Sequence, residues 1–111
     1  MLLLITSKAS KATLDKSAQD LDGYIKFVVD IDKKIMTAGG LRHFEGEQLL
    51  LLNGSRQKDL WGGGVDLQTK ELDYESMINI RPAQNNSSRE LLDLKIRDQV
   101  KQIVSDLLVK I

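Results

Sequence analysis

The sequence has no cysteine, a single proline and a single histidine among its 111 residues. The missing cysteines exclude disulfides, cysteine nucleophiles and zinc ribbons. No run of apolar residues approaches the ~18 that a membrane-spanning helix needs. Neither sign of charge is in excess, since 16 Lys and Arg balance 16 Asp and Glu. We therefore expect no membrane partner, and the missing basic excess argues against nucleic acid as a partner.

A single domain over residues 1–111 is what this length predicts. An average chain of this size buries about two-thirds of its unfolded surface, so an ordinary apolar core can hold the fold. The start of the chain, MLLLITSK, has no basic region and no small-residue cleavage site around its short apolar run. It therefore does not match a signal peptide. We expect a buried strand there and a cytoplasmic protein.

The spacing of apolar residues predicts an α+β fold. We expect strands at 2–5, 24–31, 35–38, 57–61 and 77–81, and helices at 11–21, 44–52 and from Asp93 to the end of the chain. The order β-α-β-β-α-β-β-α predicts an antiparallel or mixed sheet of four to five strands, with about three helices that cover one face. The glycines at 62–64 are expected to interrupt the strand predicted at 57–61. Residues 65–75 are expected to form a loop or an edge hairpin.

Polar residues are concentrated in three segments, at 43–47, 54–62 and 76–89. In the first, His43 and Glu47 lie four residues apart, which places them on one face of a helix. Three roles remain open for His43: a solvated or paired surface residue, a catalytic or ligand-contacting residue, and a metal ligand. Because the sequence has no second histidine, the zinc pattern of two histidines is absent and we predict no metal site.

The second and third polar segments are each expected to contain an extended stretch. Alternation of side chains places Asp59 and Trp61 on one face of the first stretch, and Asn79 and Arg81 on one face of the second. If the two stretches are neighbours in the sheet, these four side chains converge. A guanidinium beside amides and hydroxyls is suited to bind a carboxylate or another anion. The predicted ligand-binding residues are Gln57, Asp59, Trp61, Asn79, Arg81, Gln84, Asn86 and Ser88.

Two roles remain open for Arg81: an accessible ligand-binding residue and a structural partner of Asp59. In an accessible site, Arg81→Ala should change the free energy of unfolding by no more than about 0.5 kcal/mol. In a buried pair, the same substitution leaves the Asp59 carboxylate without its partner and should cost about 3–5 kcal/mol. We expect the accessible arrangement.

These residues favour a small binding module whose polar face binds an anionic small molecule or a partner protein. A first alternative is a small hydrolase or nuclease-like enzyme, in which His43 or Asp59 is the general base and Arg81 stabilises the developing negative charge. A second alternative is an interaction protein of a paired regulatory system. The sequence has neither a phosphate-binding loop nor a G-x-S-x-G nucleophile motif, and we predict no cofactor. We also expect a homodimer, because uncovered edges of a small sheet favour pairing with a second copy.

Four stretches of the sequence resemble a family of small uncharacterised proteins of cyanobacteria and other bacteria. They are VVDIDKKIM-AGG-R-H, GSRQKDLWG, SMINIRPAQ-N-S and the late IR---K-IV, and they cover nearly all of the chain from Val28. The resemblance implies no activity, because that family has no established function. It marks as motif positions His43, Glu47, Ser55, Gln57, Asp59, Trp61, Ser76, Asn79, Arg81, Gln84, Asn86, Ser88 and Arg97. The chain departs from the family pattern at Arg42, near Gly46 and at the glycines 62–64.

Overall fold

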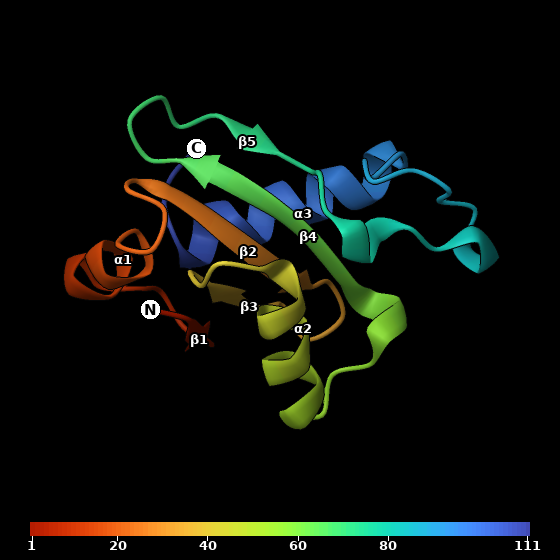
Figure 1. Cartoon of the computed structure of the whole chain (residues 1–111), viewed down its shortest axis with the longest axis horizontal. Coiled ribbons are helices and arrows are strands. Elements are labelled where there is room, and N and C mark those ends of the chain that lie inside the picture. The colour runs from red at the N-terminus through yellow and green to blue at the C-terminus, as the bar shows by residue number, and fades with distance from the viewer.

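Five antiparallel strands form one sheet, in the order β1-β3-β2-β4-β5. The computed structural model describes all residues from Met1 to Ile111, and Figure 1 shows their arrangement. The strands are β1 (Leu3–Ile5), β2 (Tyr24–Asp30), β3 (Ile35–Ala38), β4 (Leu60–Asp66) and β5 (Leu72–Asp73). The helices are α1 (Lys11–Ser17), α2 (His43–Leu52) and α3 (Leu94–Leu107). The predicted α+β class is confirmed. The order of the elements also agrees, but its last strand is β5 and not the strand predicted at 77–81.

The hairpin between β2 and β3 lies at the centre of the sheet. One oxygen of the Asp30 carboxylate accepts hydrogen bonds from the N–H groups of Asp32 and Lys33, both at 2.9 Å. The other oxygen accepts a hydrogen bond from the Ser55 hydroxyl at 2.6 Å. Lys34 supplies the left-handed residue of the turn, with a φ of 56°. The predicted hairpin is therefore present, although neither Gly nor Asn occupies the position that favours them.

The helices cover both faces of the sheet, with α2 in front of it and α3 behind it in Figure 1. Val28 of β2 packs with Leu50 of α2 on one face. Phe27 and Val29 belong to the larger core, which includes the apolar residues of α3, on the other face. The expectation that the helices cover one face is wrong. Neighbouring residues of a strand point to opposite faces, so three consecutive apolar residues in β2 need cover on both sides.

The predicted caps start the first and last helices. The Ser10 hydroxyl accepts a hydrogen bond from the Thr13 N–H at 3.1 Å, and the Asp93 carboxylate accepts one from the Lys95 N–H at 2.8 Å. The first helix is shorter than predicted and ends at Ser17. None of the helices is long and apolar enough to cross a membrane.

The three consecutive glycines lie inside β4, so the predicted interruption at these residues is wrong. Residues 62–64 pair with residues 26–28 of β2 along a regular antiparallel ladder. A Cβ atom on Gly64 would overlap the hydroxyl group of Tyr24. The glycines therefore let side chains lie directly on the strand, as expected where a backbone is closely approached. The strand also begins later than predicted, because Gln57–Asp59 form a 3₁₀ turn.

The strand predicted in the third polar segment is absent, and a 3₁₀ turn occupies Met77–Asn79 instead. The Ser76 hydroxyl starts this turn by accepting a hydrogen bond from the Ile78 N–H at 3.2 Å. Asn79 is fully buried, whereas Ile80, which lies on the opposite face of the predicted strand, is 40% exposed. In a turn, side chains do not alternate between two faces as they do in a strand. Asn79 therefore points inward here, and Ile80 points outward. A second 3₁₀ turn follows at Pro82–Gln84.

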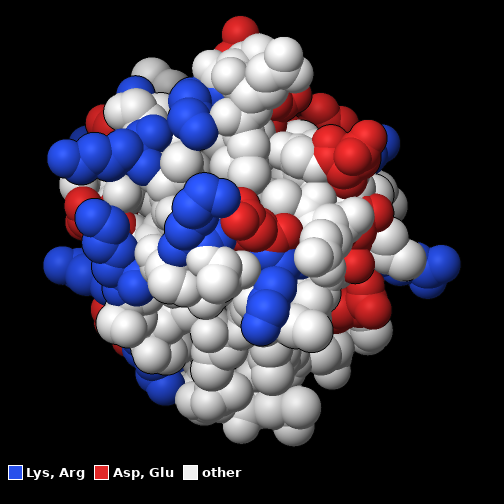
Figure 2. All heavy atoms as spheres, turned by 90° about the vertical axis from the view of Figure 1, so that its left-hand side faces the viewer, with Lys and Arg blue, Asp and Glu red and all other residues white.

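Charged side chains of both signs occupy the face of the molecule that Figure 2 shows. Apart from basic atoms at its left margin, the lower part of that face has no Lys, Arg, Asp or Glu in Figure 2. The end of α2 consists of Leu49–Leu52, of which Leu52 is 84% exposed. Neither sign of charge covers this face alone, in line with the net charge of zero.

Candidate functional site

Asn79 takes the place of a neighbouring strand along the outer edge of β4. Its side-chain oxygen accepts a hydrogen bond from the Gly62 N–H, and its Nδ2 donates one to the Gly62 carbonyl, both at 2.9 Å. Nδ2 also lies 3.0 Å from the Tyr74 carbonyl and 3.2 Å from the Arg89 carbonyl. Because β5 pairs only with the far end of β4, this amide group satisfies backbone groups that would otherwise remain open.

Arg81 holds the start of the same strand. Its guanidinium donates hydrogen bonds to the carbonyl oxygens of Gln57 and Leu60. The guanidinium also lies over the Trp61 ring, 3.8 Å from the ring centroid, at a distance typical of a cation–π contact. Burial lowers the pKa of Arg81, and nearby carboxylates oppose this decrease. Backbone carbonyls and an aromatic face therefore hold the arginine in place.

The ion pair between Arg81 and Asp59, the alternative to an accessible Arg81, is not formed. The Asp59 carboxylate instead lies 3.4 Å from Nε of Arg56, whose side chain is 64% exposed. The partners of the Arg81 guanidinium are backbone carbonyls and not a carboxylate. The sequence contains no signal for these hydrogen bonds, since every residue has a backbone carbonyl and none is marked as the acceptor.

We expect Arg81→Ala to lower the free energy of unfolding by about 2 kcal/mol, because two backbone carbonyls lose a charged donor. Arg81→Lys should recover little of this loss, since an ammonium group cannot donate with the fork geometry of a guanidinium. Urea denaturation measures both variants. The control is Lys58→Ala, because Lys58 is exposed and makes no ion pair, and it should stay within about 0.5 kcal/mol of the wild type. An Arg81→Ala variant as stable as the control contradicts the structural role.

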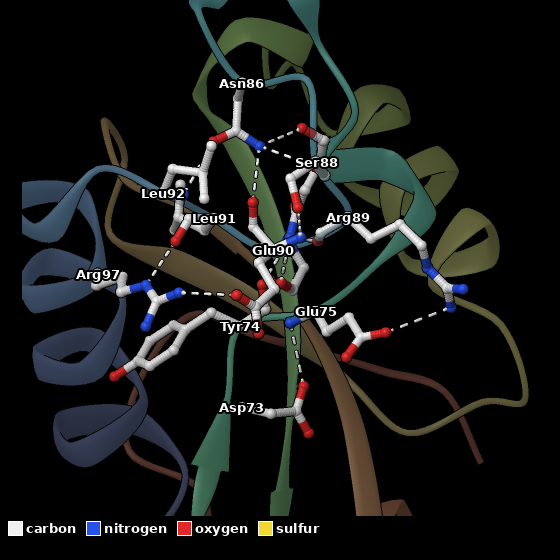
Figure 3. A network of polar contacts seen from close by, with 12 residues as sticks. Asp73, Tyr74, Glu75, Asn86, Ser88, Arg89, Glu90, Leu91, Leu92 and Arg97 are labelled. Carbon is white, nitrogen blue, oxygen red and sulfur yellow. Dashed lines mark hydrogen bonds and ion pairs between the residues drawn. The ribbon is translucent and has the colours of Figure 1, made fainter.

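Asn86 fixes the loop that follows, as Figure 3 shows. Its Nδ2 lies 2.8, 3.0 and 2.9 Å from the carbonyl oxygens of Asn79, Ser88 and Glu90, which share its two N–H donors. Its side-chain oxygen accepts one from the Leu92 N–H at 2.9 Å. A fully satisfied buried amide of this kind gives a loop one conformation.

Two further predicted site residues also bond to the backbone. The Ser88 hydroxyl accepts a hydrogen bond from the Glu90 N–H at 3.0 Å. Nε2 of Gln84 donates one to the Lys58 carbonyl at 3.0 Å, which connects the loop to the turn before β4. The polar side chains of the third segment thus form a frame that holds its own backbone against β4.

A cavity of about 570 Å³ lies between the start of α2, the start of β2, β5 and the turn at Met77–Asn79. Its volume falls within the range of small-molecule pockets, about 300–1,000 Å³. Apolar side chains form part of its wall. Its polar lining includes Tyr24, Lys26, Arg42, His43, Asp73 and Glu75.

His43 is the first residue of α2 and directs one ring nitrogen toward β4. Its Nε2 lies 2.7 Å from the Gly63 carbonyl oxygen, which can only accept, so Nε2 carries the proton and Nδ1 the lone pair. Nδ1 makes no hydrogen bond in the chain and is not one of the buried atoms without a partner, so solvent reaches it. Burial lowers the pKa of His43 below its usual 6.5, despite the opposing effect of the bond to Gly63. At neutral pH the imidazole is therefore an uncharged acceptor.

The lowered pKa of His43 should appear in a proton NMR titration, where the single histidine gives an isolated signal. We expect a pKa below the usual value of 6.5. Because the unfolded chain then binds its proton at higher pH than the folded chain, stability present above about pH 6.5 is lost as the pH falls through the folded-state pKa. His43→Gln should remove this part of the pH dependence. A titration midpoint at or above the usual value contradicts the structure.

Two of the cations that line the cavity have no acidic partner in the chain. Lys26 and Arg42 make no ion pair, whereas Arg89 lies 3.6 Å from Glu75, as Figure 3 shows. Together with Asp73, the lining contains three cations and two carboxylates, which gives it a net charge of +1. The cavity therefore has free positive charge beside an ion pair.

Of the predicted site residues, only His43 lines the cavity. The others lie around the start of β4 and in the loop after the Met77–Asn79 turn: Gln57, Asp59, Trp61, Asn79, Arg81, Gln84, Asn86 and Ser88. The enzyme alternative requires Arg81 beside His43 or beside Asp59. Arg81 does not line the cavity that contains His43, and the ion-pair partner of Asp59 is Arg56. No group of three or more His, Asp or Glu side chains is arranged to hold a metal ion.

Most of the charged lining was not identified from the sequence. Lys26 is the clearest missed signal, because it is a charged residue within the apolar strand YIKFVVD, and a lysine is rarely buried without a reason. Asp73 and Glu75 lie on either side of Tyr74, in a region with no predicted function. Only the sheet register places these residues near the start of α2.

Comparison with known families shows that residues 3–107 match the model of a family described as protein of unknown function, DUF5674. The match extends over nearly the whole chain. No curated protein and no solved structure matches the sequence. An activity therefore has to be inferred from the site itself, because function depends on the site and not on the fold.

Proposed function

The chain belongs to the DUF5674 family of proteins of unknown function, and we propose that it is a binding module for an anionic small molecule, which it holds in the cavity at the start of α2. The observation that carries this proposal is the presence of two unpaired cations, Lys26 and Arg42, in one cavity of about 570 Å³. Pockets that bind small molecules combine apolar walls with a few convergent polar groups, and this cavity has both.

The cations are placed so that an anionic ligand gains from both. Lys26 is half-buried on β2, opposite Gly64 of β4. Arg42 immediately precedes α2 and is exposed. A half-buried ammonium without an acidic partner loses part of its hydration, and a ligand carboxylate or sulfonate would compensate for that loss with charge-assisted hydrogen bonds.

Apolar side chains beside the cations suit the rest of such a ligand. Phe44 and Met77 both line the cavity, and they are 59% and 65% exposed. Single exposed apolar residues are common on protein surfaces, but these two come from different elements and lie at the same cavity. Methionine adapts its shape to a partner, and phenylalanine offers a flat face. The ligand is therefore expected to combine an anionic group with an apolar body.

Anilinonaphthalene sulfonate tests this proposal, because it combines an aromatic body with a single negative charge and fluoresces more strongly in an apolar site. We expect saturable binding to the folded wild type. The double variant Lys26→Gln/Arg42→Gln should weaken this binding about tenfold or more, the equivalent of about 1.4 kcal/mol. The matched control is Lys101→Gln, an exposed lysine on α3 outside the cavity, which should bind the dye like the wild type.

Two results contradict the proposal. One is the absence of a saturable fluorescence increase with the folded wild type. The other is equal affinity in the double variant and the control, because binding would then depend on another part of the surface. Circular dichroism and urea denaturation of each variant show that the comparison is made between folded proteins.

A further inference from the structure

The charges around the cavity have a second feature, which concerns the carboxylates. The Asp73 carboxylate accepts hydrogen bonds from the Tyr24 hydroxyl at 2.6 Å and from the Glu75 N–H at 3.1 Å, and it makes no ion pair. The Glu75 carboxylate contacts Arg89 through one oxygen at 3.6 Å and is 51% exposed. A carboxylate has about four acceptor positions, so both residues retain capacity to bind a donor.

From this we propose that the ligand is a zwitterion of the α-amino acid class with an apolar side chain, an inference that rests on the proposed function. The carboxylate of the amino acid is bound by Lys26 and Arg42, and its ammonium group is bound by Glu75, Asp73 and Nδ1 of His43. Its side chain packs on the apolar residues of the cavity wall.

His43 contributes an acceptor at this place. Since Nε2 donates to the Gly63 carbonyl at 2.7 Å, Nδ1 presents a lone pair, and it has no partner in the chain. Burial lowers the pKa of His43, so the ring is uncharged at neutral pH and does not repel a cationic group. A neutral imidazole beside two carboxylates is suited to an ammonium donor.

The same charges disfavour ligands with several negative charges. The lining has three cations, but one of them, Arg89, is already paired with Glu75. A phosphate monoester would bring a charge of about −1.5 to −2 next to two carboxylates, and like charges in a partly buried site are repelled. A ligand with one negative and one positive charge matches a lining whose own net charge is +1.

Isothermal titration with three related probes tests the inference. L-phenylalanine carries both charged groups, hydrocinnamate lacks the ammonium group, and phenethylamine lacks the carboxylate, while all three have the same aromatic ring. We expect L-phenylalanine to bind about tenfold or more tightly than either analogue, because each analogue leaves one set of charged residues without a partner.

Glu75→Gln provides the matched test on the side of the protein. This substitution should weaken L-phenylalanine binding about fivefold or more, while hydrocinnamate should bind as tightly as before or more tightly, because Arg89 is released from its ion pair. Glu71→Gln is the control, since Glu71 is an exposed acid that does not line the cavity. It should leave the affinities for both probes unchanged.

The outcomes separate this inference from the proposed function. Equal or tighter binding of hydrocinnamate to the wild type overturns the zwitterion while the anion-binding cavity stands. Absence of binding for all three probes, with saturable and Lys26/Arg42-dependent binding of anilinonaphthalene sulfonate, also overturns the zwitterion alone. Loss of dye binding as well overturns the proposed function.

Discussion

Asn79→Ala is expected to lower the free energy of unfolding by about 3–5 kcal/mol, because it removes the side chain that satisfies both backbone groups of Gly62 at the open edge of β4. Asn79 is fully buried, and its amide group binds both backbone groups of Gly62. It also binds the carbonyls of Tyr74 and Arg89. After truncation the Tyr74 and Arg89 carbonyls keep the N–H groups of Leu91 and Ser76 as donors, so the two backbone groups of Gly62 are the ones that lose their partner. Each unsatisfied buried group costs about 1–3 kcal/mol.

Two further variants make the Asn79 experiment specific. Asn79→Asp keeps the shape and the acceptor but loses both donors, so it should be destabilised to a similar extent. Gln48→Ala removes an exposed amide from α2 and should stay within about 0.5 kcal/mol of the wild type. Guanidinium denaturation measures all three. An Asn79→Ala variant within about 1 kcal/mol of the wild type would show that the edge of β4 does not depend on this residue.

Val104→Asp should be the most destabilising of the substitutions considered, with a loss of about 4 kcal/mol or more. Val104 lies in α3 with no exposed surface and belongs to the core that covers one face of the sheet. An aspartate there either buries a charge without a partner or becomes protonated at a cost in free energy.

A total stability of about 5–15 kcal/mol is usual for a domain of this size, so the loss expected for Val104→Asp removes a large part of it. Val104→Ala is the companion variant, and its expected loss is about 1–3 kcal/mol, because it removes two buried methyl groups without adding charge. Gln102→Asp places the same aspartate on the exposed side of α3 and should cost less than about 1 kcal/mol. Equal melting temperatures for Val104→Asp and Gln102→Asp contradict the assignment of the buried face.

The elements predicted correctly are those that depend on local sequence signals. In α3 the apolar residues recur three and four positions apart, and Asp93 caps the start of the helix, so the helix follows from periodicity and capping alone. The hairpin after β2 follows from two β-rich runs separated by a short charged turn. These signals identify an α+β fold without any tertiary information, although they do not locate its last strand.

The errors lie where tertiary contacts determine the backbone. Glycines at 62–64 predict a break locally, but in the structure they extend β4 because Tyr24 and other side chains occupy the space of their missing Cβ atoms. The alternation around Asn79 predicts a strand, yet the Asn79 amide binds a neighbouring edge, and this selects a turn. Neither contact can be recognised in the sequence, because in each one a side chain lies against the backbone of a residue that is distant in the chain.

The candidate site illustrates the same distinction. His43 was recognisable as a residue of special chemistry, because it is the single histidine of the chain. Lys26, Asp73 and Glu75 join it only through the register of β2, β4 and β5, which hydrophobic patterning does not specify for polar residues. The polar residues of the family motifs bond largely to backbone groups. Such bonds require an exact side-chain geometry, just as a ligand-binding site does.

The central claim is that the anion-binding site of this chain is the cavity at the start of α2 and not the loop that contains Arg81 and Asn86. Amide NMR spectra recorded while the protein is titrated with anilinonaphthalene sulfonate test it most directly. The account predicts that the largest saturable shifts occur at the amides of Lys26, His43 and Ser76, which belong to three different elements of the cavity wall. Largest shifts at Arg81 and Asn86, with those three amides unmoved, would contradict it.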